Sequence, residues 1–150
     1  MRGAQRPRGF TLLELLLVVA LIAVSVGMVS LSLRDADANR LEEEAQRLSA
    51  LLDSARARSR AMGRPVAWQP VKDGSAFRFS GLPDGQALPS QWLDERTRAQ
   101  VDGAPELVLG PEPIGPPQRV RLVIGERSLT LGTDGLGPFQ RLDETGSATP

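Results

Sequence analysis

One carboxylate stands at the start of a long apolar run, and it is the side chain with the clearest chemical potential in this sequence. Glu14 is followed by residues 15–33, which contain no Lys, Arg, Asp or Glu. As a helix, this run would span roughly 28 Å, close to the thickness of a bilayer's hydrocarbon core. An acidic side chain at membrane depth costs roughly 2–3 kcal/mol. Glu14 therefore needs an ionic partner.

The segment before Glu14 combines basic residues with a short motif. Arginines at positions 2, 6 and 8 precede the stretch Gly9-Phe10-Thr11-Leu12-Leu13-Glu14. This stretch resembles the motif of type IV pilins and type II secretion pseudopilins, in which a membrane peptidase cuts after the glycine and methylates the new N-terminus. The resemblance implies a cut between Gly9 and Phe10, with Phe10 becoming an N-methylated first residue.

Such a cut would supply the partner that Glu14 needs. The new α-amine of Phe10 would be a cation at the membrane's edge, where an isolated charge is unfavourable. Glu14 lies one helical turn further and can pair with that amine on its own chain or on a neighbour. Pairing between subunits would set the axial register of a filament. The alternative is that Glu14 is only a slightly polar start to an ordinary signal anchor.

Composition excludes several kinds of active site. The 150-residue chain has 18 basic and 18 acidic residues, no His and no Cys. A Ser-His-Asp triad, a Cys nucleophile and a structural zinc site are therefore excluded. The Gly-rich turns lack phosphate-loop spacing. We expect no enzyme activity, no catalytic or metal-binding residue and no cofactor.

Charge around the apolar run predicts its orientation. Three arginines precede the run, whereas Arg34, Asp35 and Asp37 follow it. The positive-inside tendency then keeps the N-terminus in the cytoplasm and exports everything after Leu33, which in a Gram-negative cell is the periplasmic side. We predict a single-pass inner-membrane protein. A secretory signal peptide cut after Ala38 is the rival, but the run exceeds the usual core of about 7–15 residues and Glu14 is misplaced for one.

A helix is predicted to continue beyond the membrane. Residues 34–62 contain no Pro and no Gly, and strong helix formers dominate. One face carries apolar residues at alternating spacings of four and three: Leu41, Ala45, Leu48, Leu52 and Ala55. We expect this face to pack on the chain's own domain, with a coiled coil as the alternative. Gly63 and Pro65 are the predicted stop.

Residues 64–150 read as a β domain, because short alternating runs are punctuated by Gly and Pro. Strands are expected around residues 66–69, 77–79, 106–109 and 139–142, and residues 143–150 are expected to form a polar tail. Most of 81–117 is expected to be loop, in which Trp92-Leu93 pins a short segment to the core. A hairpin is predicted for 119–124 and 127–131, joined by a type II′ turn at Gly125-Glu126. Its register pairs Val120 with Leu131 and Leu122 with Leu129.

Two weaker clusters favour plain structural roles. Asp134, Asp143 and Glu144 could suggest calcium, but only Asp134 lies in a tight turn, so a turn is preferred. A second cluster, made by four arginines, could suggest DNA binding. Arg56, Arg58 and Arg60 do not share a helical face, and a solvated helix end is the preferred interpretation of the cluster. These arginines are Arg56, Arg58, Arg60 and Arg64.

The second half of the chain narrows the resemblance. Gly63-Arg64-Pro65-Val66-Ala67-Trp68, residues 109–113 and residues 133–139 resemble the minor pseudopilin H family of type II secretion (the GspH family). This implies an α+β, pilin-like fold, in which a long N-terminal helix packs on a small antiparallel β-sandwich. The expected parts are a leader (1–9), a transmembrane segment (10–33), a periplasmic helix (34–63) and a β-rich domain (64–150).

The same resemblance implies a function and partners. Members join a pseudopilus tip complex that primes filament assembly and helps export folded periplasmic proteins across the outer membrane. The implied partners are other minor pseudopilins, the major pseudopilin, the prepilin peptidase, the inner-membrane assembly platform and the membrane itself; nucleic acid is not expected. A minor type IV pilin of the FimT or FimU kind, acting in pilus assembly or DNA uptake, is the alternative. A second alternative is a secreted binding domain that starts at Asn39.

Overall fold

The computed structural model describes residues 11–142, except for the side chains of residues 27–35. The chain divides into two compact units, Met1–Asp35 and Ala36–Pro150. Helix α1 (Leu12–Met62) has residues in both units, and among the described residues seven strands follow it in the second unit. The predicted polar tail from Asp143 onward lies outside the described residues.

The C-terminal end of α1 has a Schellman cap. The Arg64 N–H donates to the Ser59 carbonyl and the Gly63 N–H to the Arg60 carbonyl, each at 3.3 Å. Gly63 has φ +62°, the left-handed conformation that this cap requires of its glycine. The Ser59 hydroxyl donates to the Arg64 carbonyl at 2.7 Å. The predicted stop at Gly63 is confirmed.

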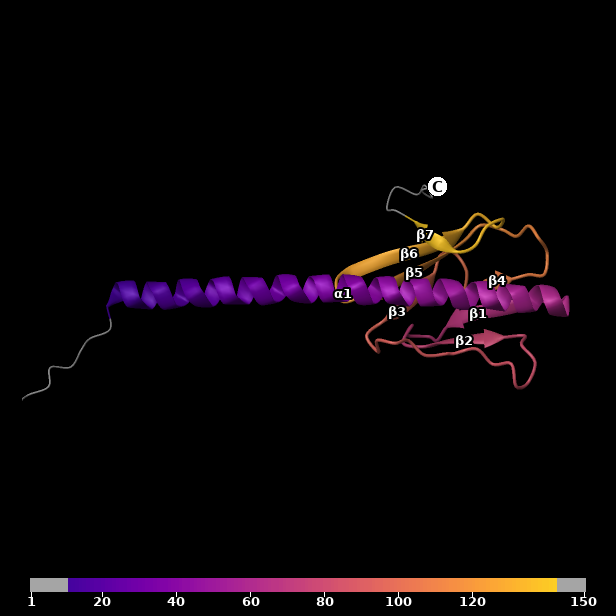
Figure 1. Ribbon diagram of the computed structural model, residues 1–150, viewed down its shortest axis with the longest axis horizontal. Helices are drawn as coiled ribbons and strands as arrows, with labels where there is room; N and C mark the ends of the chain where they lie inside the picture. Colours follow the sequence, from indigo (N-terminus) through magenta and orange to yellow (C-terminus); the bar gives the residue numbers. More distant parts are fainter. Residues whose placement is uncertain (1–10, 143–150) are drawn as a thin grey trace, which may run out of the picture. The chain divides into compact units, whose positions relative to one another are not determined.

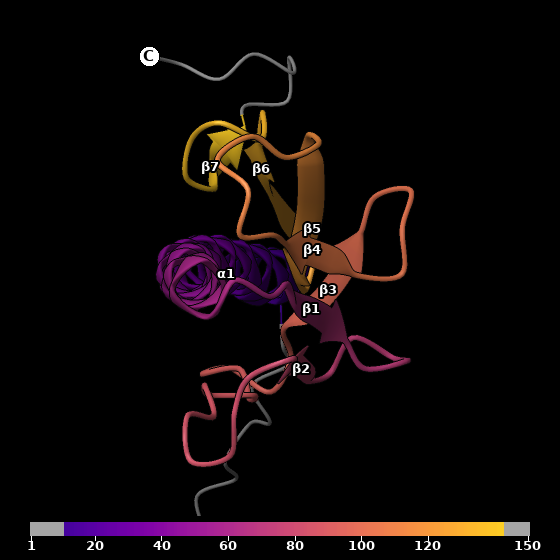
Figure 2. The ribbon, with the colours of Figure 1, turned by 90° about the vertical axis from the view of Figure 1, so that its right-hand side faces the viewer.

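The predicted apolar face of α1 is confirmed as the helix's share of the core. All five of its residues are buried: Leu41, Ala45, Leu48, Leu52 and Ala55. They pack against residues of the strands in one hydrophobic cluster. Figure 2, viewed along α1, shows the strands on one side of the helix. The structure therefore shows that this face packs on the chain's own domain and does not form a coiled coil.

The strands form two antiparallel sheets (Figure 1). The first has the order β2-β1-β4 and contains β1 (Val66–Pro70), β2 (Phe77–Ser80) and β4 (Leu107–Leu109). The second has the order β3-β5-β6-β7 and contains β3 (Arg98–Val101), β5 (Gln118–Ile124), β6 (Arg127–Thr133) and β7 (Gln140–Leu142). A long helix followed by antiparallel sheets is the α+β arrangement expected from the sequence.

The hairpin of β5 and β6 has the predicted register. Val120 pairs with Leu131 and Leu122 with Leu129, and all four side chains are buried. Gly125 has φ +57°, and no described residue other than glycine has a positive φ. A positive φ at the first turn position alone is the type II′ geometry. The alternation of buried side chains and the geometry of the Gly125 turn therefore favour the same register between β5 and β6.

Two details of the 81–117 region differ from the prediction. Part of the expected loop is strand β3, whose residues alternate between exposed and buried. Trp92 is buried, as expected of a residue that pins this segment to the core, but its neighbour Leu93 is 65% exposed. Leu93 is held instead through its backbone, because its N–H donates to the Glu44 carboxylate.

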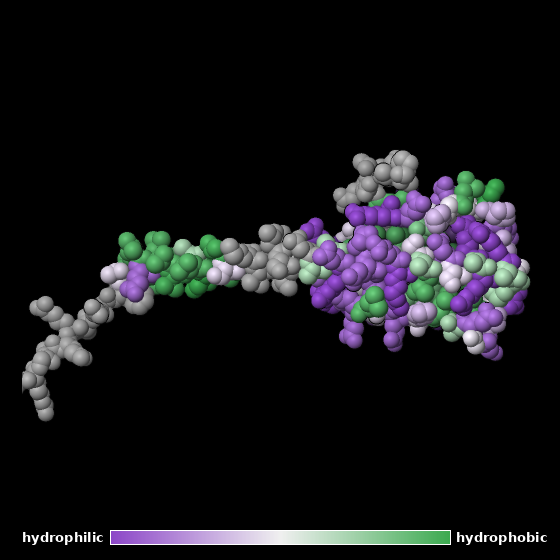
Figure 3. Space-filling model, in the orientation of Figure 1, coloured by the Kyte–Doolittle hydropathy of each residue, from purple (hydrophilic) through white to green (hydrophobic). Residues whose placement is uncertain are grey.

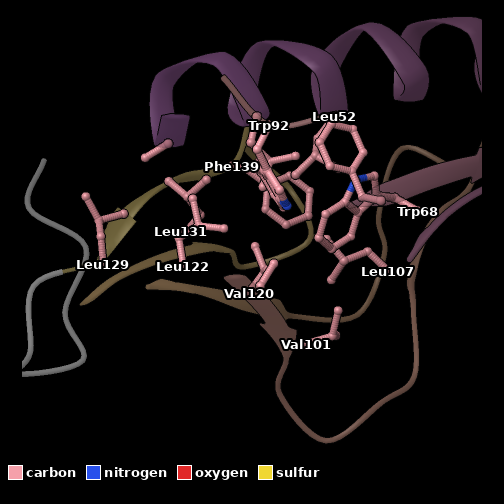
Figure 4. Close-up of a cluster of buried hydrophobic side chains, with 14 of the residues drawn as sticks. Leu52, Trp68, Trp92, Val101, Leu107, Val120, Leu122, Leu129, Leu131 and Phe139 are labelled. Carbon is pink, nitrogen blue, oxygen red and sulfur yellow. The ribbon is translucent and has the colours of Figure 1, made fainter. Parts of the chain in front are cut away.

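Aromatic side chains fill the centre of the core between the sheets and α1 (Figure 4). Trp68 is fully buried, and its ring lies 5.8 Å from Phe77 and 6.5 Å from Trp92 between ring centroids. The Trp92 indole N–H donates to the Gly74 carbonyl at 3.0 Å. Trp92 therefore links the core to the turn between β1 and β2.

Residues 86–96, which we name the polar strap, are tied to α1 by side chains at successive turns of the helix. Glu44 is buried and accepts the N–H groups of Leu93 and Asp94. Four arginine contacts complete the attachment: Arg58 to the Gln86 carbonyl, Arg47 to the Gln91 carbonyl, Arg40 to Asp94, and Arg96 to Asp37. The strap thus has no strand pairing but many polar contacts with the helix.

Candidate assembly site

The first turn of α1 positions Glu14. The Glu14 N–H is 3.0 Å from the Thr11 carbonyl oxygen and 3.3 Å from the Thr11 hydroxyl, so Thr11 acts as the N-cap. Glu14 is exposed, and its carboxylate is in the first turn, where the positive end of the helix dipole favours an anion. The capped first turn of α1 therefore defines the backbone position of Glu14, the predicted assembly residue.

The helix beyond Glu14 is apolar around its whole circumference. The large apolar side chains from Leu12 to Val26 are exposed in the described chain, with Leu12 at 80% and Val26 at 64%. Figure 3 shows this apolar surface along residues 12–26. The one hydroxyl in this stretch beyond Thr11 is that of Ser25, and it donates to the Leu21 carbonyl at 2.8 Å. A helix that is hydrophobic all round is normally covered by lipid or by other helices.

None of the helical segments among the described residues combines the length and the apolar character that a membrane crossing needs. The predicted transmembrane segment, 10–33, extends into residues outside the described set. Gly9 and Phe10 also lie outside it. Membrane crossing and cleavage between Gly9 and Phe10 therefore stay predictions.

Comparisons with known proteins place the chain in a family. Residues 5–30 match the prokaryotic N-terminal methylation motif. Type II secretion system protein H of Pseudomonas aeruginosa is 32% identical, with the match covering 93% of this chain and 84% of that protein. This chain belongs to the type II secretion system protein H family. The protein H of Escherichia coli is 37% identical over 59% of this chain, and the match spans 60% of its length.

Solved structures show that this protein H family member has the pilin fold. The type IV minor pilin FimU of P. aeruginosa superposes with a TM-score of 0.56 at 17% identity, covering 71% of this chain and 91% of FimU. A second crystal form of FimU gives a TM-score of 0.54 at 16% identity, covering 70% and 94%. At this identity the likeness concerns the fold alone. The predicted pilin-like α+β class is confirmed.

Arg56 corrects the prediction of a solvated helix end. Its side chain is buried, and its guanidinium donates to the carbonyls of Gly135 at 2.8 Å and Gly137 at 2.9 Å. The Gly115 N–H donates to the same Gly135 carbonyl at 3.0 Å. The β6–β7 turn leaves these carbonyls without strand partners, and a buried carbonyl needs a donor. Arg56 therefore joins α1 to the β6–β7 loop, and the Gly115 N–H joins that loop to the β4–β5 loop.

Local structure accounts for the described residues of the two weak clusters, whereas Asp143 and Glu144 lie outside the described set. Arg58 donates to the Gln86 carbonyl in the polar strap, whereas the side chains of Arg60 and Arg64 are exposed. The Asp134 carboxylate accepts the N–H groups of Leu136 and Gly137, as in an Asx turn. In the described part of the chain, no group of three His, Cys, Asp or Glu residues is placed to hold a metal ion.

Acid is expected to weaken the attachment of the polar strap through Asp94. Hydrogen bonds from the Arg96 side chain and backbone, with a smaller effect of Arg40, lower the pKa of Asp94 from 3.8 to about 2. A lowered pKa in the folded state means that the stabilisation is complete above the ordinary pKa and is lost as pH falls towards 2. Because both arginines are about half exposed, we expect a loss of only about 1 kcal/mol.

Urea unfolding of the full chain in detergent, followed by Trp fluorescence at pH 5 and pH 2.5, measures this effect. Asp94→Asn should show a smaller fall in unfolding free energy between the two pH values than the wild type. The turn carboxylates Asp73 and Asp134, whose pKa values hydrogen bonds also lower, titrate alike in both proteins. Equal falls in the two proteins would refute the role of Asp94.

Proposed function

We propose that the chain is a minor pseudopilin of a type II secretion system. It is made as a precursor, cut between Gly9 and Phe10, N-methylated at Phe10 and held in the inner membrane by residues 10–33, with the domain that follows in the periplasm. From the membrane it is incorporated into the tip complex of the pseudopilus, which primes assembly and helps export folded proteins. Membership of the protein H family is the observation that carries this proposal.

The described helix supports the proposed assembly step. A helix with an apolar surface on all sides suits both lipid and the helical core of a filament, so extraction from the membrane exchanges one apolar environment for another. Glu14 is the polar exception on this surface, apart from Thr11 and Ser25. Its carboxylate lies one turn after the proposed new amine of Phe10. During assembly, this carboxylate would pair with the Phe10 amine of a neighbouring subunit.

The mature N-terminus tests the processing step directly. We expect intact mass and N-terminal sequencing of the chain from its native membrane to give N-methylated Phe10. Cleavage between Gly9 and Phe10 would create the α-amine of Phe10, the cation that Glu14 is proposed to neutralise. A start at Asn39 would remove the apolar segment from the mature protein, and the proposal would fall with it.

Partner capture separates this function from the alternative. The pilin fold is shared with the minor pilin FimU, so the fold itself favours neither system. In the bacterium that makes the chain, affinity purification should recover the other minor pseudopilins and the major pseudopilin. Recovery of type IV pilus subunits instead would favour a minor pilin.

A further inference from the structure

The exposed face of the β3-β5-β6-β7 sheet gathers positive charge from separate segments. Arg98 and Gln100 on β3 lie directly opposite Val123 and Arg121 on β5. Strand alternation puts Arg119 on the same face, two residues from Arg121. Side chains at opposite and diagonal positions of such a pair lie roughly 5–8 Å apart. Three arginines therefore share a small area of one sheet.

A groove of about 500 Å³ crosses this face, and we name it the basic groove. The turn between β1 and β2 forms one wall, and β3 and β5 form its floor. The lining residues that matter here are Val71, Lys72, Arg98, Gln100, Arg121 and Val123. Among the described residues, no carboxylate pairs with Lys72 or Arg121. The Asp73 carboxylate also lines the groove and is an anion among these cations, because hydrogen bonds from the hydroxyl and backbone N–H of Ser75 lower its pKa.

The wall of the groove packs closely against its floor. A Cβ on Gly74 would lie 2.9 Å from the backbone N and O atoms of Ala99, so the turn approaches β3 as closely as only glycine allows. Gly74 also has φ +74° and accepts the Trp92 indole N–H from the core. A site that is already formed loses little entropy when a ligand binds.

We propose that the basic groove binds an acidic segment of a neighbouring pilin-like subunit. This inference rests on the proposed function, which supplies such neighbours. The unpaired charges of Lys72 and Arg121 would meet carboxylates, and Val71 and Val123 would cover an adjacent apolar side chain. Nucleic acid fits less well, because the groove is partly apolar and offers few cations, whereas a duplex-binding protein can make about 6–10 phosphate contacts.

Photo-crosslinking in the producing bacterium tests this surface in the full chain. A p-benzoylphenylalanine at Gln100, on the floor of the groove, should give an adduct with an acidic segment of another pilin-like protein. The double change Lys72→Glu and Arg121→Glu should lower the adduct about tenfold, because it opposes like charges across the contact. Arg121→Lys keeps the positive charge and should retain most of the adduct.

The matched control is Arg64→Glu, the same reversal at an exposed arginine outside the groove. It should leave the adduct unchanged, and retained adduct in Arg121→Lys shows that the contact depends on the positive charge at this position. No adduct, an adduct with nucleic acid or with an unrelated protein, or one insensitive to the double reversal would overturn the proposal. Recovery of pseudopilins with the wild-type chain, measured in the same cells, tells whether the proposed function still stands.

Discussion

Replacing Glu14 by glutamine is expected to lower incorporation of the chain into the pseudopilus by tenfold or more. Glutamine keeps the size of the side chain but cannot neutralise the amine of a processed Phe10. That cation would then be buried in the apolar filament without a partner, at a cost of roughly 2–3 kcal/mol. Incorporation is measured as the fraction of the membrane pool recovered with purified pseudopilins.

Three companion measurements make this test specific to Glu14. Intact mass should still show a methylated Phe10, so the defect must follow processing. Glu43→Gln, at an exposed carboxylate of the same helix, should incorporate normally. Glu14→Asp, which keeps the charge on a shorter side chain, should be intermediate. Full incorporation of Glu14→Gln with a methylated Phe10 would refute the pairing.

Gly135→Ala is expected to destabilise the folded chain by at least about 3 kcal/mol. A Cβ on Gly135 would lie 1.9 Å from the Gly115 carbonyl oxygen, far inside any permitted contact, and the residue has φ +92°. The Cβ position is fixed by the backbone of residue 135 and the oxygen belongs to the backbone of Gly115, so neither can swing away. Relief would require the β4–β5 and β6–β7 loops to separate, breaking the hydrogen bond from the Gly115 N–H to the Gly135 carbonyl and displacing the carbonyl that Arg56 also binds.

Two other glycines provide matched controls for this prediction. Gly63→Ala has the same kind of positive φ, +62°, but nothing lies within 4 Å of its Cβ, so it should cost only about 1–2 kcal/mol. Gly137→Ala lies in the same loop without a positive φ and should cost less still. Denaturant unfolding of the full chain in detergent, read through the buried Trp68 and Trp92, gives all three values. Equal costs at Gly63 and Gly135 would contradict the clash.

Local patterns predicted the elements whose contacts are close in sequence. The five-residue face of α1, the cap at Gly63 and the β5–β6 register follow from helical spacing, from glycine's access to positive φ and from a two-residue turn. Strand β3 was missed, although its alternation was visible, because Arg98 and Gln100 weakened the apolar signal. Periodicity reports local geometry, and these elements depend on little else.

The contacts that sequence reasoning missed join residues far apart in the chain. Arg56 is charged and stands near a helix end, which normally indicates solvent, yet it meets carbonyls about eighty residues later. Glu44 lies next to the apolar face and is buried only because the polar strap returns to it. The basic groove draws Lys72, Arg98 and Arg121 from three segments. No single window of sequence contains such a group.

The polar strap also restricts where this chain can change its length. Four of its helix-borne contacts stand at Asp37, Arg40, Glu44 and Arg47, so each of these is spaced from the next by three or four residues and faces the same side. Deleting one residue of the helix between them would rotate every later contact by about 100° away from the strap. Insertions and deletions should therefore be excluded from residues 37–47 and 86–96, and accumulate in the exposed turn around Gly103, which makes no such contact with α1 in the described structure.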